Sequence, residues 1–175
     1  MKSLDIGCGN HKVLGAVGLD NIKMSGVDVV HDLNKFPYPF KDNSFDAIFA
    51  NHVLEHLVPD LDKIMAELSR ICTPLGKIVI EVPNSLSIGA FADPTHKKFF
   101  AYHTFDYFGS NEQSYYTKTR LKVLKRKLII NNGRLGSLIF KPLEKILNWQ
   151  QKIYLLWPNI FPVTTLHFEV QPIKN

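Results

Sequence analysis

The sequence predicts a single-domain α/β protein built on one mostly parallel β-sheet, with an antiparallel hairpin of strands at its C-terminal edge. Short apolar runs alternate with crossover segments, which is the pattern of a parallel sheet with covered faces. A chain of 175 residues that is 45% hydrophobic is long enough for one sizeable core and short for two. We therefore expect one domain over residues 1–175, with a first half of 1–83 and a second half of 84–175.

The first half contains five predicted strands and one predicted helix. Each strand is an apolar run that is bounded by Gly, Pro, Asn or charged residues. The helix follows from apolar residues at positions 61, 64, 65, 68 and 71, with Pro59 in its first turn and Pro74 beyond its end. The strands are expected at 4–6, 16–20, 27–31, 45–50 and 77–82, and the helix at 59–72.

The second half is predicted to contain two helical segments and two strands. The segments are a short aromatic helix at 104–108, a strand within 121–131, a helix at 142–157 and a strand at 165–173. We expect the two strands to pair at the edge of the sheet. Residues 133–163 would then form an insertion between them.

Charge and cysteine content limit the classes of function. Residues 1–117 carry 10 Lys/Arg and 14 Asp/Glu, whereas residues 118–175 carry 11 Lys/Arg and 2 Asp/Glu, so the basic surface is C-terminal. Neither an export signal nor a run of 18 apolar residues is present, which makes the cytoplasm the default location. Cys8 and Cys72 form no C-x-x-C pair, so neither a disulfide framework nor a cysteine zinc site is expected.

Residues that suit ligand binding follow four of the predicted strands. Ligands of open α/β sheets bind at the C-terminal ends of the strands. Gly7 and Gly9 allow a tight turn and close approach of the backbone. Asp20 can accept hydrogen bonds from a vicinal diol, and Asp32 with the Leu33 backbone can bind an exocyclic amine. Asn51-His52 follows the fourth strand.

In this order the motifs resemble those of the class I S-adenosylmethionine-dependent methyltransferases, a Rossmann-like family, and in particular their type 11 branch. The resemblance covers residues 3–83 through LDIGCGN, GLD, HDL, FPYPFKDNSFDAIFANHVLEHL and LGKIVIEVPN. It implies S-adenosyl-L-methionine as cofactor and methyl transfer as activity. The implied cofactor contacts are Asp5, Gly7, Cys8 and Gly9 for the amino-acid portion, Asp20 for the ribose, Asp32 and Leu33 for the adenine, and Asn51 and His52 near the sulfonium.

Two features depart from the family pattern. The third glycine of the loop is replaced, because Asn10 and His11 follow Gly9. The crossover over residues 10–15 is also short: as a helix it would span ~9 Å, less than the ~16 Å that a return along a five-residue strand needs. The same residues extended reach ~20 Å, so we expect an irregular crossover. With no N-terminal helices ahead of Met1, a lid over the substrate is expected from the second half.

His52-Val53-Leu54-Glu55-His56 also matches H-x-x-E-H, a spacing that some zinc peptidases use to bind metal and activate water. Such a motif lies in a long helix, whereas this one directly follows a strand and ends two residues before Pro59. We therefore interpret it as a strand exit with a structural Glu55 and predict no metal. A zinc-dependent hydrolase using His52, Glu55 and His56 and a non-catalytic cofactor-binding protein remain the alternatives.

The acceptor side offers several candidates for a general base. These are His52, His56, His96 and His103, with Asp93 and Tyr102 nearby in the sequence. The fourth strand exits without an Asn/Asp-Pro-Pro-aromatic turn, and no cysteine motif of base methylation is present, so nucleic acid is not favoured. An unidentified oxygen or nitrogen acceptor remains, on a small molecule, a lipid-linked compound or a cell-envelope precursor.

The predicted helix at 142–157 is amphipathic. Its apolar face comprises Leu143, Ile146, Leu147, Ile153, Tyr154 and Trp157, and ten Lys/Arg lie between Lys118 and Lys152. One interpretation is a helix that docks on its own domain as a lid. A second is peripheral contact with an anionic membrane surface, in which Trp149 would take part. A third is contact with nucleic acid or a protein partner. The sequence indicates no oligomeric state.

Overall fold

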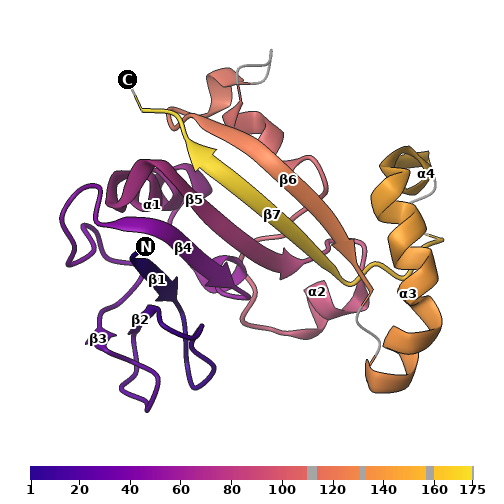
Figure 1. Ribbon diagram of the computed structural model, residues 1–175, viewed down its shortest axis with the longest axis horizontal. Helices are drawn as coiled ribbons and strands as arrows, with labels where there is room; N and C mark the ends of the chain where they lie inside the picture. The colour runs from indigo at the N-terminus through magenta and orange to yellow at the C-terminus, as the bar shows by residue number, and fades with distance from the viewer. Residues whose placement is uncertain (110–113, 131–132, 157–159, 175) are drawn as a thin grey trace.

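The computed structural model describes residues 1–109, 114–130, 133–156 and 160–174. Its strands form one seven-stranded sheet in the order β3-β2-β1-β4-β5-β7-β6 (Figure 1). Neighbouring strands among the first five are parallel, and β7 is antiparallel to both β5 and β6, which confirms the predicted fold class. The strands are β1 (Ser3–Ile6), β2 (Val17–Asp20), β3 (Val29–Val30), β4 (Phe45–Asn51), β5 (Cys72–Pro83), β6 (Leu121–Ile129) and β7 (Thr165–Pro172).

The helices are few and mostly short. They are α1 (Leu61–Ile71), α2 (Ile88–Ala92), α3 (Gly133–Trp149) and α4 (Gln151–Leu156), with 3-10 turns η1 (Leu54–His56), η2 (Thr104–Phe108) and η3 (Ser114–Tyr116). The apolar face that predicts α1 is buried at Ile64, Met65, Leu68 and Ile71. These side chains belong to one hydrophobic core with inward-facing strand residues such as Ile48 and Ile80. No described helix has the length and apolar character that crossing a bilayer requires.

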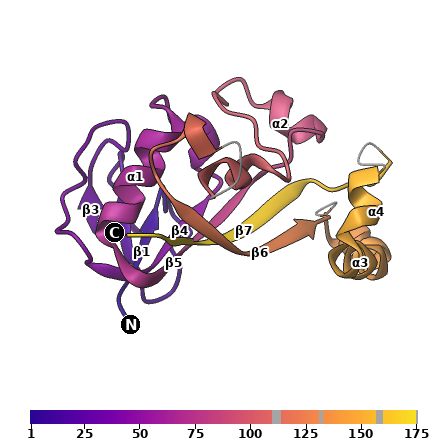
Figure 2. The same ribbon diagram turned by 90° about the horizontal axis from the view of Figure 1, so that it is seen from above.

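The expectation that both sheet faces are covered is wrong for the β5–β7–β6 part of the sheet, whereas β1 is buried on both faces at Leu4, Asp5 and Ile6. Figure 2 shows α1 and α2 on one side of the sheet, while α3 and α4 lie beyond the end of the β6–β7 hairpin. The other face carries paired polar side chains. Glu169 lies 3.2 Å from Lys77 and 3.3 Å from Lys125, and His167 Nδ1 lies 2.9 Å from the Glu81 carboxylate. Partly exposed polar pairs thus occupy a face that was expected to be covered.

Two element boundaries also differ from the prediction. α3 begins at Gly133, so Pro142 lies inside the helix and not in its first turn. β5 begins at Cys72, directly after α1, and continues through Pro74. Proline and glycine near positions 74–76 had indicated a loop. The segment over residues 10–15 contains no helix, as the length argument predicts.

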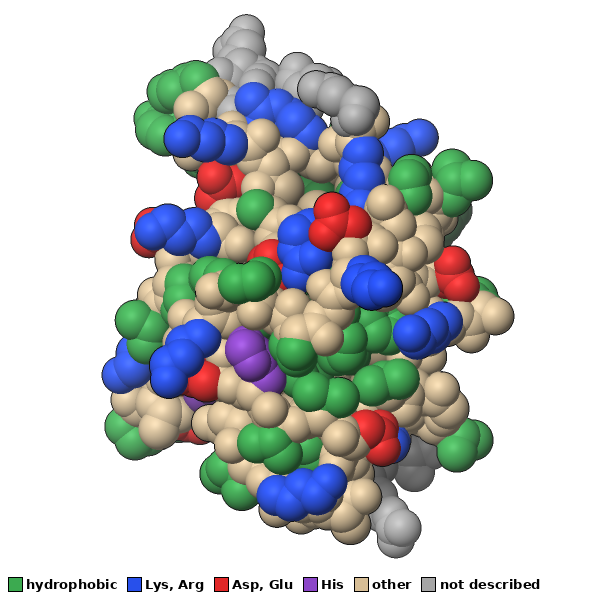
Figure 3. Space-filling model, turned by 90° about the vertical axis from the view of Figure 1, so that its left-hand side faces the viewer, with side chains coloured by type: hydrophobic (Ala, Val, Ile, Leu, Met, Phe, Trp, Pro, Cys, Tyr) green, Lys and Arg blue, Asp and Glu red, His purple; other side chains and the backbone are tan. Residues whose placement is uncertain are grey.

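Figure 3 shows the side of the molecule that carries the β3 edge of the sheet. Lys and Arg side chains are interspersed there with Asp and Glu side chains around a central group of hydrophobic side chains. The basic excess of the second half therefore does not extend over this face as one continuous surface.

Candidate functional site

The strand-end residues come together because β2, β1 and β4 are adjacent and parallel. Ile6 is in register with Leu19 on one side and with Ala50 on the other. The next residues, Gly7, Asp20 and Asn51, therefore follow at the same edge of the sheet. β3 continues this edge and is followed by Asp32.

The loop after β1 has the backbone geometry of a ligand cradle. Gly7 and Gly9 have φ of +65° and +48°, in the left-handed region that favours glycine. The Gly7 N–H donates to the Leu19 carbonyl at 2.8 Å, and the Gly9 N–H donates to Asp20 Oδ2 at 2.9 Å. Cys8 between them is buried, and burial raises the pKa of its thiol. Its side chain faces the protein, which leaves the loop backbone as the part that can meet a ligand.

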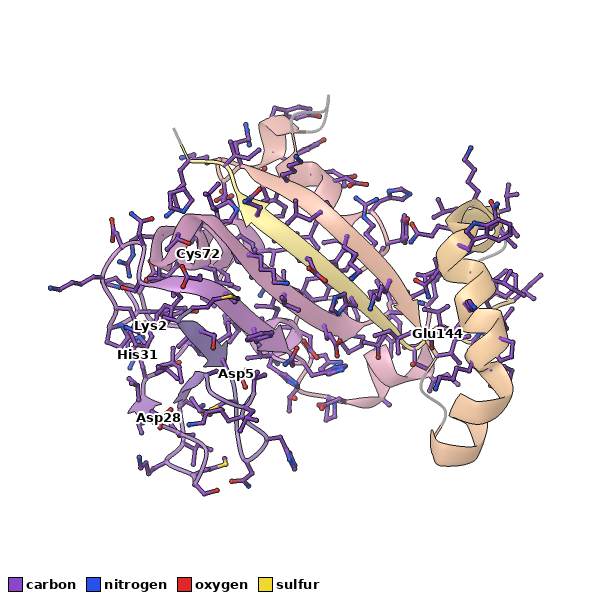
Figure 4. The ribbon with its side chains drawn as sticks, viewed as in Figure 1. Lys2, Asp5, Asp28, His31, Cys72 and Glu144 are labelled. Atoms are coloured by element: carbon purple, nitrogen blue, oxygen red, sulfur yellow. The ribbon has the colours of Figure 1, made fainter. Side chains whose placement is uncertain are left out.

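Asp5 has a different surrounding from the other predicted cofactor residues. It is 2% exposed, and its Oδ2 accepts a hydrogen bond from the Val13 N–H at 2.8 Å. Burial raises the pKa of Asp5, and the bond from Val13 counteracts that rise. Figure 4 shows Asp5 on β1 and Asp28 ahead of β3, at the same end of the molecule. Asp5 therefore anchors the irregular crossover that follows the glycine loop.

Asp20, Asp32 and Leu33 lie where an adenosine group would extend along the edge. Asp20 Oδ1 accepts from the Asn21 N–H at 2.7 Å, so its two oxygens are each oriented by a backbone donor. The backbone N–H and side-chain amide of Asn34 lower the pKa of Asp32. Leu33 is buried, and its carbonyl accepts the Tyr38 hydroxyl at 3.0 Å.

His52 begins the second part of the site. It has φ of +51°, and its Nδ1 lies 3.4 Å from Oε1 of the buried Glu55. Contact with that carboxylate raises the pKa of His52, and burial opposes the rise. Next to His52 lies a cavity of about 850 Å³, which His56, Asp93 and His96 also line.

The structure separates the four histidine candidates. His52, His56 and His96 line the cavity, whereas His103 is not among its described lining residues. Nδ1 of His103 lies 2.6 Å from Asp106, and burial together with the charge of Arg126 lowers the pKa of His103. Sequence reasoning missed the contribution of residues 160–165, which follow α4 and line the cavity. No local motif in that segment indicates a site.

The zinc peptidase geometry is not formed. His52 precedes the short 3-10 turn η1, so His52 and His56 do not lie one turn apart on a long helix. The described groups that could share a metal ion include Glu55 and His56 but not His52.

The strand-end set fits S-adenosylmethionine by two observations. A Cβ added to Gly9 would meet no described protein atom within 4 Å, so the loop backbone there borders open space. The Asp20 carboxylate is oriented by the Gly9 and Asn21 N–H groups and retains lone pairs for a ribose diol. The cavity beside His52 then adjoins the position of the reactive end.

Comparisons with known proteins agree with this geometry. Residues 20–80 match the sequence model of a type 11 family described as "Methyltransferase domain". The chain is 31% identical over 103 residues to sterol 4-C-methyltransferase strm-1 of Caenorhabditis elegans, covering 44% of this chain and 29% of that protein. It is 32% identical over 102 residues to methyltransferase GfsG of Streptomyces halstedii, covering 45% and 36%. The chain thus matches much less than two thirds of either relative.

A crystal structure of an S-adenosylmethionine-dependent methyltransferase from Archaeoglobus fulgidus has the same fold. Its TM-score is 0.61 at 21% identity, over 97% of this chain and 85% of that chain. None of these three proteins is named a hydrolase, so the hydrolase alternative has no support.

Proposed function

The chain belongs to the class I S-adenosylmethionine-dependent methyltransferases, in their type 11 branch, and we propose that it transfers a methyl group from this cofactor to an oxygen or nitrogen acceptor. The observation that carries the proposal is the glycine loop and Asp20 side by side at one sheet edge, with a cavity adjoining at His52. S-adenosylmethionine supplies a sulfonium-bound methyl group, which the acceptor displaces in line. The protein's part is to hold both partners in that line.

Each part of the site has a role in this proposal. The Gly7–Gly9 backbone would hold the amino-acid portion, the Asp20 carboxylate would accept from the ribose hydroxyls, and Asp32 would bind the adenine. The acceptor would enter the cavity between η1 and residues 160–165. A neutral imidazole there can accept the proton of an acceptor hydroxyl or amine. His52, His56 and His96 are the candidates because they line this cavity.

Calorimetry with S-adenosylhomocysteine tests the cofactor site. Asp20→Ala should weaken binding by about 1.5–3 kcal/mol, because it removes a charged acceptor of two hydroxyl hydrogen bonds. Asp60→Ala is the matched control, since Asp60 is an exposed acid ahead of α1. Equal affinity of the Asp20 and Asp60 variants would contradict the ribose assignment. Single-turnover transfer of a labelled methyl group to a cell extract separates the enzyme from the non-catalytic alternative.

The rim of the cavity favours an amphipathic acceptor. Leu86, Ile88 and Ile160 line the cavity and are 52%, 89% and 68% exposed. Apolar side chains that are this exposed at the mouth of a site suit an acceptor with a hydrocarbon portion. Phe91 of α2 is exposed as well and stacks on Phe99, with ring centroids 4.5 Å apart.

The surface of α3 and α4 has the same character. Leu147 and Tyr154 are buried against the domain, whereas Ile146, Trp149, Ile153 and Leu156 are exposed at successive spacings of three or four residues. Trp157, which the predicted apolar face included, lies outside the described residues. Exposed lysines flank this stripe at positions 141, 145 and 152. An apolar stripe bordered by cations suits an anionic lipid surface. We therefore propose a lipid-linked acceptor that is presented at such a surface.

Vesicle co-sedimentation tests this part of the proposal. The full chain should bind phosphatidylglycerol vesicles at low salt and less at physiological salt, since each cation near the surface contributes about 1 kcal/mol that salt screens. Trp149→Glu should weaken binding. Leu75→Glu should leave binding unchanged. Leu75 is also exposed, at 91%, but it lies near the start of β5, whereas Pro83 at the end of β5 lines the cavity. Absence of binding at both salt concentrations would remove the membrane contact and leave the docked lid.

A further inference from the structure

The cavity beside His52 contains a cluster of three potential metal ligands. Glu55 and His56 lie on η1, and His96 follows α2, 40 residues later in the chain. One ligand atom from each residue lies within 4.8 Å of the others. The His56 and His96 rings meet edge to face, with centroids 4.8 Å apart. A backbone connection fixes this arrangement, because the Glu55 carbonyl accepts from the N–H groups of Lys97 at 2.6 Å and Lys98 at 3.1 Å.

Glu55 is buried without a hydrogen-bond partner. It is 1% exposed, and neither carboxylate oxygen has a hydrogen bond among the described residues. Nδ1 of His52 lies 3.4 Å from Oε1, too far for a well-formed hydrogen bond. A buried carboxylate of this kind costs free energy unless a cation or a set of donors compensates it. A protonated His52 would compensate the carboxylate only in part, from 3.4 Å and at one oxygen, so Glu55 retains the capacity to bind a cation.

The hydrogen bonds of both histidines leave the same ring nitrogen available. The Thr95 hydroxyl donates to Asp93 Oδ1 at 2.6 Å, so its oxygen accepts from Nδ1 of His56, which lies 2.9 Å away. Nδ1 of His96 lies 2.8 Å from the Ala90 carbonyl, which can only accept. In the neutral form both imidazoles thus carry their proton on Nδ1, which leaves the Nε2 lone pair available to a metal ion. Metal-binding histidines are oriented in this way by donation from the other nitrogen.

We propose that Glu55, His56 and His96 bind a divalent transition-metal ion of the zinc class. Two imidazoles and one carboxylate are a ligand set that zinc accepts, with a fourth position open. Tetrahedral ligands about 2.1 Å from zinc lie about 3.4 Å apart, so the ligand atoms, which lie within 4.8 Å of one another, need to approach by up to about 1.4 Å on binding. Asp93 Oδ2, 3.8 Å from Nε2 of His96, adds negative charge beside the ion.

The open fourth coordination position of the metal ion suggests which class of acceptor binds. This inference about the acceptor rests on the proposed function. A metal ion would bind an acceptor hydroxyl and favour loss of its proton to water, so His56 and His96 would act as ligands in place of the general-base role considered above. That oxygen would form the new bond to the methyl carbon as the carbon–sulfur bond breaks and the sulfur leaves as a neutral thioether. The inferred substrate is therefore a hydroxyl compound and not an amine. The site differs from the peptidase pattern because His52 is not a ligand.

Zinc titration of the full chain by calorimetry, with metal content measured after dialysis, tests the site. The expected stoichiometry is one ion per chain. Glu55→Gln, nearly the same size as glutamate, and His96→Ala should each weaken binding at least tenfold. His103→Ala is the matched control, since this exposed imidazole also lies beside a carboxylate but outside the cavity. Equal loss in the His103 and His96 variants would overturn the assignment.

Two further readouts keep the result independent of folding and of methyl transfer. Zinc should raise the thermal midpoint of the wild type and of the His103 variant but not of the Glu55 variant. S-adenosylhomocysteine affinity is measured on the same samples. A wild type that binds S-adenosylhomocysteine but not zinc would overturn only the metal site. Zinc binding without cofactor binding would overturn the proposed function and leave the metal site.

Discussion

Substituting Gly7 by alanine tests how tightly the loop after β1 is built. An alanine Cβ at this position would lie 2.4 Å from Cγ2 and 2.7 Å from Cβ of Val53, in a residue with φ of +65°. The left-handed conformation costs a non-glycine residue about 1–2 kcal/mol, and overpacking costs about 1–3 kcal/mol. We therefore expect Gly7→Ala to lower the free energy of unfolding by about 2–5 kcal/mol, measured by urea denaturation with circular dichroism.

Gly9→Ala separates strain from steric overlap. Gly9 has φ of +48°, but its added Cβ would meet no described atom within 4 Å. Only the conformational cost of about 1–2 kcal/mol applies to stability. The new methyl group would extend toward the cofactor, so this variant should instead lose affinity for S-adenosylhomocysteine. A Gly7 variant as stable as the Gly9 variant would refute the packing argument.

A double-mutant cycle with Val53→Ala identifies the contact itself. Removing the two γ-methyl groups relieves the 2.4 Å overlap but leaves the Val53 Cβ at 2.7 Å, so the relief is partial. The double variant should be about 1 kcal/mol more stable than the sum of the single effects predicts. Strict additivity would mean that the loop after β1 moves away from Val53 and relieves the overlap by itself. The loop would then be more flexible than its geometry indicates.

Two further predictions concern polar pairs outside the cofactor edge. The hydrogen bond from His167 lowers the pKa of Glu81 below its ordinary value of 4.5. The pair therefore stabilises the fold fully at pH values above 4.5, and this stability is lost as the pH falls through the lowered pKa. Glu81→Gln should therefore flatten the acid side of the stability–pH curve, and an unchanged curve would show that the pair is uncoupled from folding. Tyr154→Phe should cost about 0.5–1.5 kcal/mol, because the Tyr154 hydroxyl accepts from the buried Asn84 amide at 3.1 Å; a neutral effect in urea denaturation would contradict this.

The cofactor edge could be predicted from sequence because each of its parts is local. Apolar runs that end in Gly7, Asp20 or Asn51 define strand ends, and parallel topology brings those ends together. The less covered sheet face is also encoded locally, in the alternation of apolar and polar residues along β7. β7 alternates buried Leu166 and Phe168 with partly exposed His167 and Glu169, the pattern of a sheet with one solvated face.

The cavity could not be predicted in the same way. Glu55 and His96 are brought together by hydrogen bonds from Lys97 and Lys98 to the Glu55 carbonyl, a contact across about forty residues. No periodicity or spacing encodes such a pairing. The sequence predicts a structural Glu55 because the motif directly follows a strand and does not lie in a long helix. The carboxylate is buried and has no hydrogen bond among the described residues, a property that only the fold determines.

The missing crossover helix changes how the cofactor loop is held. A helix after β1 would fix the loop through its own backbone hydrogen bonds, but residues 10–15 form no helix. Two carboxylates take that part: Asp5 accepts from Val13 N–H, and Asp28 accepts from Gly18 N–H and from Lys12 Nζ, each at 2.7 Å. Because Asp5 is buried, its protonation would weaken the Val13 anchor. The loop that faces the cofactor is therefore held by buried side-chain charge, which makes its geometry more sensitive to Asp5→Asn than a helix-capped loop would be.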